Sequence, residues 1–299
     1  MKILSLFDGI SCARVALERA GIPVEKYCAS EIDLKAISVS RKNYPDIEQL
    51  GSVVGLNMGE GIIDLLIGGS PCQDLSIAKN GRKGLDGERS GLFWEYVRIL
   101  KEAKPKWFVL ENVNSMPKEA KAIITQTLGV EPIMIDAALV SAQSRKRLFW
   151  TNITVSQPED RGVLLKDILE NGESLSDKSY CIPSTYYKEN TKSLEKRKKK
   201  GLMVRAGSLA GGRQGERVYS PEGKSATLSA SGGGLGSKTG LYLVQGAIRK
   251  LTPIECERLQ GLPDDYTDIL STTQRWKTIG NAFNVDVVTH ILKGLKPQK

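Results

Sequence analysis

The residues Ile62–Ser76 read IIDLLIGGSPCQDLS, an apolar run followed by a glycine turn and a proline–cysteine pair. The apolar half, Ile62–Ile67, predicts a buried strand. Two glycines then permit a sharp turn, and Pro71 fixes φ directly before the thiol of Cys72. In open α/β sheets, ligands bind in the crevice outside the carboxyl ends of the strands. A cysteine delivered to that edge is a candidate nucleophile, against the alternative that it is one more small packing residue.

Around this stretch, strand-like apolar runs alternate with helical patterns, which predicts an α/β domain with a mostly parallel sheet. Strands are expected at 3–7, 27–30, 62–67 and 107–110, with a later pair at 133–135 and 147–151. Helices are expected at 13–20, at 92–103, at 253–260 and, as a closing apolar helix, through residue 292. Acidic residues follow three of these strands, at Asp8, Glu31 and Glu111. Their side chains are therefore expected at the same sheet edge as Cys72.

The composition limits the chemistry. A formal charge of +9 over 299 residues points to a polyanionic partner, of which nucleic acid is the commonest. The five cysteines stand singly with no CxxC pair, which argues against a zinc site and a disulfide framework. The one histidine, His290, lies in an apolar-periodic stretch typical of a helix face. A general acid or base is therefore expected to be a carboxylate.

The first residues, before Asp8, are too few for a signal peptide, and no run is long and apolar enough to cross a bilayer. We therefore expect a cytoplasmic protein with no membrane partner.

After about residue 155 the sequence changes character, which predicts a second domain. Strand signals become short, and two segments, 206–215 and 229–240, are rich in glycine. They are read either as flexible linkers or as loops that order on a ligand. The run of like charges at 196–200 is typical of a solvated loop or helix end.

The spacing of Gly9 and Glu31 suits a nucleoside-containing cofactor. A glycine turn follows the first strand, and the acid that would accept from ribose hydroxyls comes a little over twenty residues later. The GxGxxG fingerprint is absent, since Ile10, Ser11 and Cys12 follow Gly9. A nucleoside without a diphosphate, such as S-adenosylmethionine, therefore fits better than a dinucleotide, and an NAD-type oxidoreductase is disfavoured.

A thiol, a carboxylate, a nucleoside pocket and a basic surface together suggest one reaction. The Cys72 thiolate adds to C6 of a cytosine, Glu111 protonates or hydrogen-bonds N3, and C5 takes a methyl group. The thiolate needs activation, for which Arg145 and Arg147 are candidates. A base stacked in a duplex cannot be reached in this way, so the enzyme would have to flip it out.

The order of motifs resembles that of the DNA (cytosine-5) methyltransferases from end to end. The similar segments are Phe7-Asp8-Gly9, Glu31, Pro71-Cys72-Gln73, Glu111-Asn112-Val113, Gln143-Ser144-Arg145-Lys146-Arg147, the stretch 249–263 and Gly280-Asn281-Ala282-Phe283. Segments 5–10 and 68–76 are also similar to the animal de novo methyltransferase catalytic domains. Without added regulatory domains, the chain more resembles a bacterial or phage enzyme.

This resemblance implies a Rossmann-like S-adenosylmethionine-dependent methyltransferase domain at 1–155 and 276–299, and a smaller target-recognition domain at 156–275. It implies a catalytic set made of Cys72, Glu111, Arg145 and Arg147. It implies a cofactor pocket lined by Phe7, Asp8, Gly9, Ile10, Glu31, Ile32, Val53, Pro71, Leu92, Asn281 and Phe283. Contacts to nucleic acid are expected from Gln73, Ser76, Gln143, Arg205, Arg213 and Arg217.

The expected partner is double-stranded DNA, with no metal. A cognate restriction endonuclease is a candidate further partner, and we expect a monomer, with a dimer as the alternative. Two other functions stay open, a tRNA cytosine-5 methyltransferase of the same fold and a non-catalytic DNA-binding relative. The second would be expected to have lost the thiol or the acid, whereas this chain keeps Cys72 and Glu111.

Overall fold

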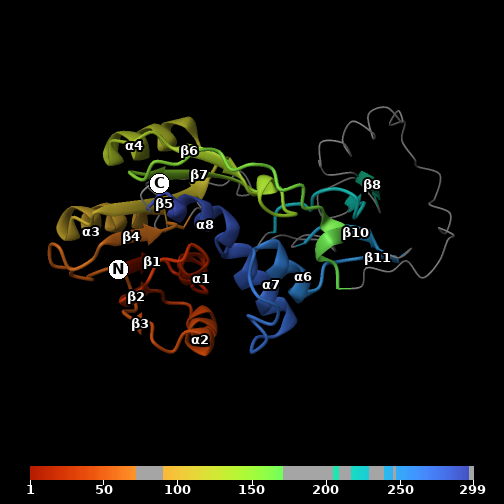
Figure 1. Ribbon diagram of the computed structural model, residues 1–299, viewed down its shortest axis with the longest axis horizontal. Helices are drawn as coiled ribbons and strands as arrows, with labels where there is room; N and C mark the ends of the chain where they lie inside the picture. The colour runs from red at the N-terminus through yellow and green to blue at the C-terminus, as the bar shows by residue number, and fades with distance from the viewer. Residues whose placement is uncertain (72–89, 171–204, 209–216, 229–238, 245–246, 296–299) are drawn as a thin grey trace. The chain divides into compact units, whose positions relative to one another are not determined.

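Seven strands form the larger of two sheets, in the order β3-β2-β1-β4-β5-β7-β6 (Figure 1). The computed structural model describes residues 1–71, 90–170, 205–208, 217–228, 239–244 and 247–295. The strands are β1 (Lys2–Leu6), β2 (Lys26–Ser30), β3 (Glu48–Gln49), β4 (Leu65–Gly68), β5 (Trp107–Val113), β6 (Ile133–Asp136) and β7 (Lys146–Thr151). The first five pair in parallel, and β7 runs antiparallel to β5. The expectation of a mostly parallel α/β sheet is confirmed.

The chain divides into two compact units. Unit 1 is made of Met1–Ile135, Lys146–Pro158 and Val287–Lys299, and unit 2 of Asp136–Arg145 and Glu159–Asp286. These bounds differ from the domain boundaries expected at 155 and 276. Part of the reason is that Ile279, expected in the catalytic domain, is fully buried in the apolar core of unit 2. That unit 2 recognises a target stays a prediction.

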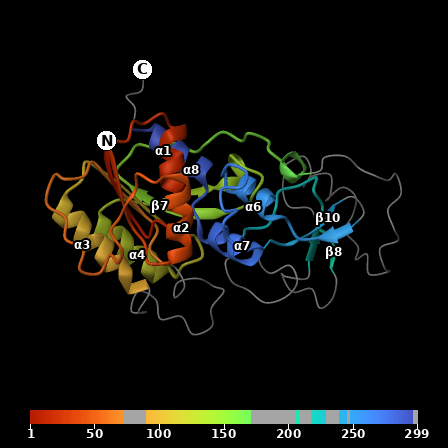
Figure 2. The same ribbon diagram turned by 90° about the horizontal axis from the view of Figure 1, so that it is seen from below.

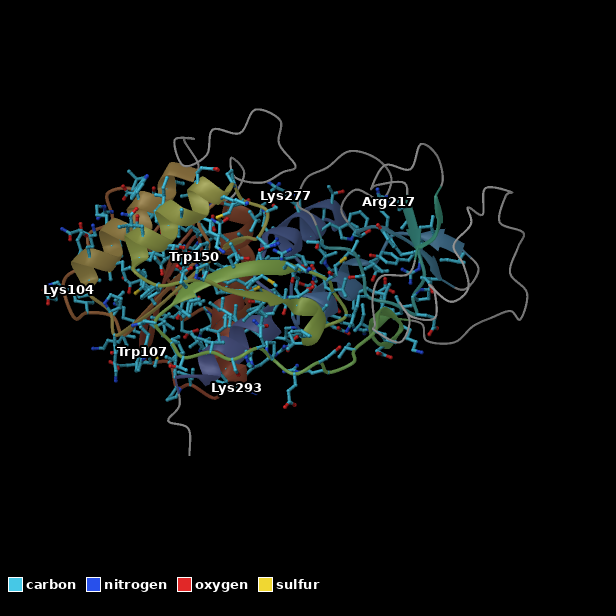
Figure 3. All side chains as sticks on the ribbon, turned by 90° about the horizontal axis from the view of Figure 1, so that it is seen from above. Lys104, Trp107, Trp150, Arg217, Lys277 and Lys293 are labelled. Carbon is cyan, nitrogen blue, oxygen red and sulfur yellow. The ribbon has the colours of Figure 1, made fainter. Side chains whose placement is uncertain are left out.

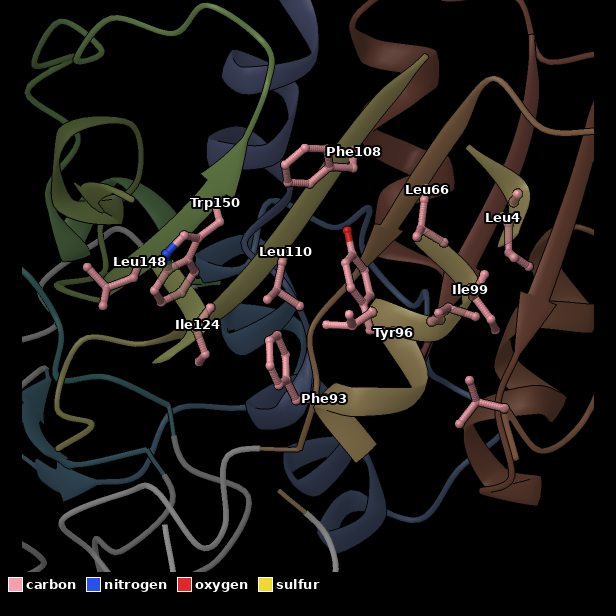
Figure 4. Close-up of a cluster of buried hydrophobic side chains, with 14 of the residues drawn as sticks. Leu4, Leu66, Phe93, Tyr96, Ile99, Phe108, Leu110, Ile124, Leu148 and Trp150 are labelled. Atoms are coloured by element: carbon pink, nitrogen blue, oxygen red, sulfur yellow. The ribbon is translucent and has the colours of Figure 1, made fainter. Parts of the chain in front are cut away.

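Helices α3 (Phe93–Ala103) and α4 (Lys118–Leu128) cover one face of the large sheet. Successive side chains of a strand point to opposite faces, so Leu4 of β1 meets these helices while its neighbours point away. Figure 4 shows Phe93 and Tyr96 of α3 against Leu110 of β5. In Figure 3, Lys104 extends outward from the end of α3, whereas Trp150 lies in the interior and is 0% exposed. This core fixes the strands whose ends carry the site.

The opposite face is covered by α1 (Cys12–Arg19) and α8 (Val285–Lys293), which lie side by side in Figures 1 and 2. The hydroxyl of Thr289 in α8 donates to the carbonyl oxygen of Ala16 in α1 at 3.5 Å. The helix α2 (Leu34–Asn43) follows β2, and the side chain of Asp33 caps its N-terminus by accepting from the N–H of Lys35. Helix α8 therefore lies in the same layer as α1.

Three expectations need correction. Strand β4 begins at Leu65 rather than Ile62, and the first strand ends at Leu6, so Phe7 belongs to the loop. Glu111 and Asn112 lie inside β5 instead of after it, because pairing with β7 continues the strand to Val113. The helices α2 and α4 were not expected. The sequence of α2, LKAISVSRKN, carries few apolar residues, so its amphipathic pattern is weak.

Unit 2 is built on a four-stranded sheet in the order β11-β10-β9-β8. Its strands are β8 (Arg205–Ser208), β9 (Arg217–Tyr219), β10 (Leu241–Val244) and β11 (Ala247–Arg249), and its helices are α6 (Pro253–Leu259) and α7 (Thr272–Asn281). Thr252 and Glu255 form a capping box at the start of α6, as expected for a helix that begins at a proline. The described residues also contain three short 3-10 helices, η2 (Ser90–Leu92), η3 (Ala137–Leu139) and η4 (Leu165–Ile168).

Within the described residues, no helix is both long enough and apolar enough to span a lipid bilayer.

Candidate active site

The turn that leads to Cys72 is held from below by β5. The amide nitrogen of Asn112 donates to the hydroxyl of Ser70 at 3.2 Å, and both side chains are buried. Gly68 ends β4 where a Cβ atom would lie 2.8 Å from the carbonyl oxygen of Leu6, so only glycine fits there without a shift. Pro71 is the last described residue before 90, and Cys72, Gln73 and Ser76 lie outside the described residues. Their predicted roles stay predictions.

Glu111 and Arg147 form an ion pair across β5 and β7. Nε of Arg147 lies 2.9 Å from Oε1 of Glu111. The side chain of Glu111 is only 14% exposed, and that of Arg147 is 18% exposed. The antiparallel register places Arg147 opposite Val113, two residues beyond Glu111 and on the same face. Leu110 pairs with Gly68, so Glu111 lies at the level of the turn that follows β4. A partly desolvated carboxylate is thus fixed beside the segment that carries the thiol.

The carboxylate of Glu31 ties two loops together at the carboxyl ends of β1 and β2. Oε2 accepts from the N–H of Gly9 at 2.8 Å, and Oε1 accepts from the N–H groups of Ile32 and Asp33 at 2.8 and 2.9 Å. A carboxylate offers about four acceptor positions, so capacity remains for a hydroxyl donor. The side chain of Ile32 beside it is 73% exposed. An acid with spare acceptor capacity next to an uncovered apolar side chain fits the ribose and base of an adenosyl group.

The loop after β1 has an unusual backbone. Phe7, Gly9 and Ser11 have φ values of 57°, 62° and 59°, in the left-handed region. This conformation costs little for glycine and about 1–2 kcal/mol for other residues. Strain of this kind persists only where the surroundings fix it, and it concentrates at ligand-binding segments.

Asp8, at the centre of this loop, points into the protein. It is 7% exposed, and its carboxylate accepts from the hydroxyl of Tyr27 at 2.6 Å and from that of Ser11 at 2.5 Å. The side chain of Asp8 therefore supports the loop from beneath, and that Asp8 lines the cofactor pocket stays a prediction. Tyr27 was not singled out by the sequence, because an inward hydroxyl on a strand has no local signal.

Burial raises the pKa of Asp8 from 3.8 to about 6, despite the hydrogen bonds from Ser11 and Tyr27, which lower it. The native state thus holds this proton more tightly than the unfolded chain, so the group's contribution to stability falls as pH rises from about 4 to 6. Above that window the ionised carboxylate costs about 3 kcal/mol at 1.36 kcal/mol per pKa unit.

Asp8→Asn should therefore raise the free energy of unfolding at pH 8 by about 1–3 kcal/mol, and leave it nearly unchanged at pH 4. Urea unfolding at the two pH values measures this difference. Asp46→Asn, at a carboxylate that is 61% exposed, is the matched control and should show no such pH dependence. A variant of Asp8 that is less stable than the parent at pH 8 would contradict the assignment.

The other predicted cofactor residues come from both units. The side chains of Ile10 and Val53 are buried, at 1% and 5% exposure, so that Ile10 can reach a ligand only through its backbone. Leu92 closes the turn before α3 and is partly buried against the core. Asn281, exposed at the end of α7, and the partly buried Phe283 belong to unit 2. That these residues share one pocket stays a prediction.

Arg145 is a buried residue of unit 2. It is 4% exposed, and its guanidinium donates to the carbonyl oxygens of Leu228, Gly280 and Ala282 at 3.0–3.4 Å, all within unit 2. That Arg145 orients the cytosine or supports the thiolate stays a prediction. Its hydrogen bonds fix the Gly280–Ala282 segment.

Gln143 is likewise an internal residue. It is 0% exposed, its amide oxygen accepts from the N–H of Leu228 at 3.2 Å, and its amide nitrogen donates to Oε1 of Gln260 at 3.3 Å. No part of the Gln143 side chain is exposed in this structure, and that it contacts nucleic acid stays a prediction. Polar residue type alone could not distinguish a buried amide from a DNA-binding one.

Two of the three arginines predicted to contact DNA lie in strands of the small sheet. Arg205 begins β8, and Arg217, labelled in Figure 3, begins β9 with a partly exposed side chain. Arg213 lies outside the described residues. Among the described residues, no group of three or more His, Cys, Asp or Glu side chains is arranged to hold a metal ion.

Known proteins are similar to this chain over most of its length. The family model of the C-5 cytosine-specific DNA methylases matches residues 1–297. The type II methyltransferase M.HhaI of Haemophilus parahaemolyticus is 31% identical over 97% of this chain and 93% of its own. The orphan methyltransferase M.Rho11sI of Bacillus phage rho11s is 30% identical over 83% of this chain and 61% of its own.

Solved structures share the fold at lower identity. The Dnmt2 methyltransferase of S. pombe matches with a TM-score of 0.65 and 17% identity, over 99% of each chain. The methyltransferase EhMeth of Entamoeba histolytica matches with a TM-score of 0.69 and 17% identity, over 99% of this chain and 97% of its own. Taken with the family model that spans nearly the whole sequence, these findings show that the chain belongs to the C-5 cytosine-specific DNA methylase family.

Proposed function

We propose that the protein transfers a methyl group from S-adenosylmethionine to C5 of a flipped cytosine in duplex DNA, through a covalent adduct of Cys72. The observation that carries this proposal is the Glu111–Arg147 ion pair at 2.9 Å, fixed at the sheet edge where Ser70 and Pro71 lead to the thiol. The nucleophile and the acid then approach the pyrimidine ring from neighbouring strands.

In the proposed reaction, the Cys72 thiolate forms a bond to C6 of the cytosine while Glu111 holds or supplies a proton at N3. Electron density shifts to C5, which becomes nucleophilic. When bound, the cofactor would supply an electrophilic methyl group, which C5 takes as the sulfonium sulfur leaves as a neutral thioether. The C5 proton then leaves to a base, the Sγ–C6 bond breaks, and the thiolate is restored. Flipping the base out of the helix is required because C6 and N3 are otherwise stacked and paired.

Arg147 and Arg145 have different roles in this scheme. Arg147 orients the Glu111 carboxylate through its Nε and adds positive charge near the nucleophile, which favours the thiolate. Arg145 acts as a positioning residue, because its Nη1 and Nη2 atoms donate to the carbonyl oxygens of Leu228, Gly280 and Ala282.

The adenosyl cofactor would be held at the carboxyl ends of β1 and β2. Glu31 has acceptor capacity for a ribose hydroxyl, and the exposed Ile32 offers an apolar surface to the adenine. Space above the loop supports this, since a Cβ atom at Gly9 would meet nothing within 4 Å. Phe7, Val53, Pro71, Leu92, Asn281 and Phe283 are proposed as further pocket residues by their match to the family motifs.

Unit 2 is proposed to recognise the DNA target, with Arg205, Arg213 and Arg217 as candidate groove contacts and Gln73 and Ser76 near the flipped nucleotide. The formal charge of +9 supports a polyanionic partner. A cognate restriction endonuclease, a monomeric state and a cytoplasmic location stay predictions.

The proposal is tested with methyl-labelled S-adenosylmethionine and two substrates offered separately, duplex DNA and tRNA. Label should enter DNA at C5 of cytosine, and bisulfite sequencing of a methylated plasmid gives the target sequence. Duplex DNA carrying 5-fluorocytosine should form a covalent adduct, since fluorine cannot leave as a proton does, and Cys72→Ala should form none. Label found only in tRNA, or a covalent adduct formed by Cys72→Ala, would contradict the proposed mechanism.

A further inference from the structure

Asp8 sits at the centre of a buried polar network that the reaction itself does not use. Its carboxylate accepts from Tyr27 on β2 and from Ser11, and the hydroxyls of Ser11 and Ser40 lie 2.5 Å apart. Ser40 belongs to α2 and accepts from the amide nitrogen of Gln49 at 3.1 Å. One carboxylate thus links the loop after β1 to β2, α2 and β3.

The backbone around Asp8 is also tied to its neighbours. The N–H of Asp8 donates to the carbonyl oxygen of Ser30 at 3.2 Å, and its carbonyl oxygen accepts from the N–H of Ser11 at 3.2 Å. On either side, Phe7 and Ser11 are held in the left-handed conformation that non-glycine residues rarely adopt. The hydrogen bonds of Asp8 hold the strained loop in this conformation.

We propose that the ionised side chain of Asp8 is a positioning residue, which holds the segment Phe7–Ser11 in the conformation that receives the adenosyl cofactor. This inference rests on the proposed cofactor site, at which Gly9 and Glu31 are already joined by a 2.8 Å hydrogen bond. The carboxylate itself need not touch the cofactor, since it is buried beneath the loop.

Ionisation matters because a charged acceptor makes stronger hydrogen bonds than a neutral one. The groups that act on Asp8 are the hydroxyls of Ser5, Ser11 and Tyr27, which favour the charge, and the Glu31 carboxylate, which opposes it. The buried charge of Asp8 weakens the native state at neutral pH. A residue that costs stability in this way is expected to serve a function.

The test is cofactor affinity, measured by titration calorimetry on the full-length protein without DNA, between pH 5 and pH 8. For the parent, the affinity for S-adenosylmethionine should fall about tenfold as pH falls through 6, the loss expected for one weakened charge-assisted hydrogen bond. Asp8→Asn should bind about tenfold more weakly at pH 8, with a flat pH profile. The protein contains one histidine, so few other groups titrate in this range.

Tyr27→Phe makes the assignment sharper, because it removes a single hydroxyl. The bond from Tyr27 favours ionised Asp8, so its loss should move the midpoint of the affinity profile to higher pH. Asp46→Asn is the control and should keep the parent profile, since that carboxylate is 61% exposed.

S-adenosylhomocysteine, which lacks the sulfonium charge, separates positioning from simple attraction. Positioning predicts that both ligands lose affinity alike in Asp8→Asn, whereas a loss confined to the cationic ligand would overturn the inference. If the parent binds the cofactor normally and Asp8→Asn has the same affinity, the role of Asp8 is overturned. The proposed function would be unaffected by that result. A parent protein that binds neither ligand at any pH would overturn both.

Discussion

Replacing Glu111 by glutamine is expected to lower kcat for DNA methylation by about 10²–10⁴, the usual contribution of one positioned acid. Glutamine keeps the length of glutamate and one carbonyl oxygen, so it can still accept from Nε of Arg147, which lies 2.9 Å from Oε1 of Glu111. It cannot hold or deliver the proton at N3 of the cytosine. C5 then stays a poor nucleophile, and single-turnover methylation of a duplex substrate measures the loss.

The matched control is Glu60→Gln, which removes a carboxylate from an exposed ion pair with Lys104 in the same unit. Exposed pairs contribute little, so both stability and kcat should stay at the parent level. Affinity for DNA should change little in Glu111→Gln, because the carboxylate acts on one base. A Glu111→Gln protein that turns over like the parent would remove the acid from the mechanism.

The sheet and the order of the motifs could be predicted because their signals are local. Apolar runs of strand length identify β1, β4 and β5, and the residues just after each run give Asp8, the glycine turn before Pro71, and Glu111. Motif order along the chain then pointed to the family, which the match over residues 1–297 confirms.

The direction in which a side chain points could not be predicted, because it depends on packing between distant segments. Asp8 turns inward because the hydroxyl of Tyr27, nineteen residues along the chain, reaches it at 2.6 Å. Gln143 is buried because its partner Gln260 comes 117 residues later. Both residues looked like ligand contacts from their motifs, and both support the structure around the site. A motif therefore identifies a segment more reliably than it assigns each of its side chains a task.

Arg145→Met is expected to lower the free energy of unfolding of unit 2 by about 2–5 kcal/mol. The carbonyl oxygens of Leu228 and Gly280 would lose their guanidinium donors inside the protein. Ala282 is spared in part, because its carbonyl oxygen also accepts from the amide nitrogen of Gln260 at 3.3 Å. Amide hydrogen exchange, resolved by peptide, should show faster exchange across α7 and the residues around Leu228 than across the large sheet.

Kinetics then separate the two roles that the motif allows. If Arg145 is a positioning residue, Arg145→Met should lose stability and cofactor affinity, while the folded fraction keeps a kcat near that of the parent. The stability of Arg145→Lys should fall between that of the parent and that of Arg145→Met. An ammonium keeps the charge but lacks the planar guanidinium that reaches several carbonyl oxygens. Arg161→Met is the control, because the pair of Arg161 with Asp286 is 3.4 Å long and the arginine is 47% exposed, so it should cost less than about 1 kcal/mol. A stable Arg145→Met protein with a collapsed kcat would instead return Arg145 to the catalytic set.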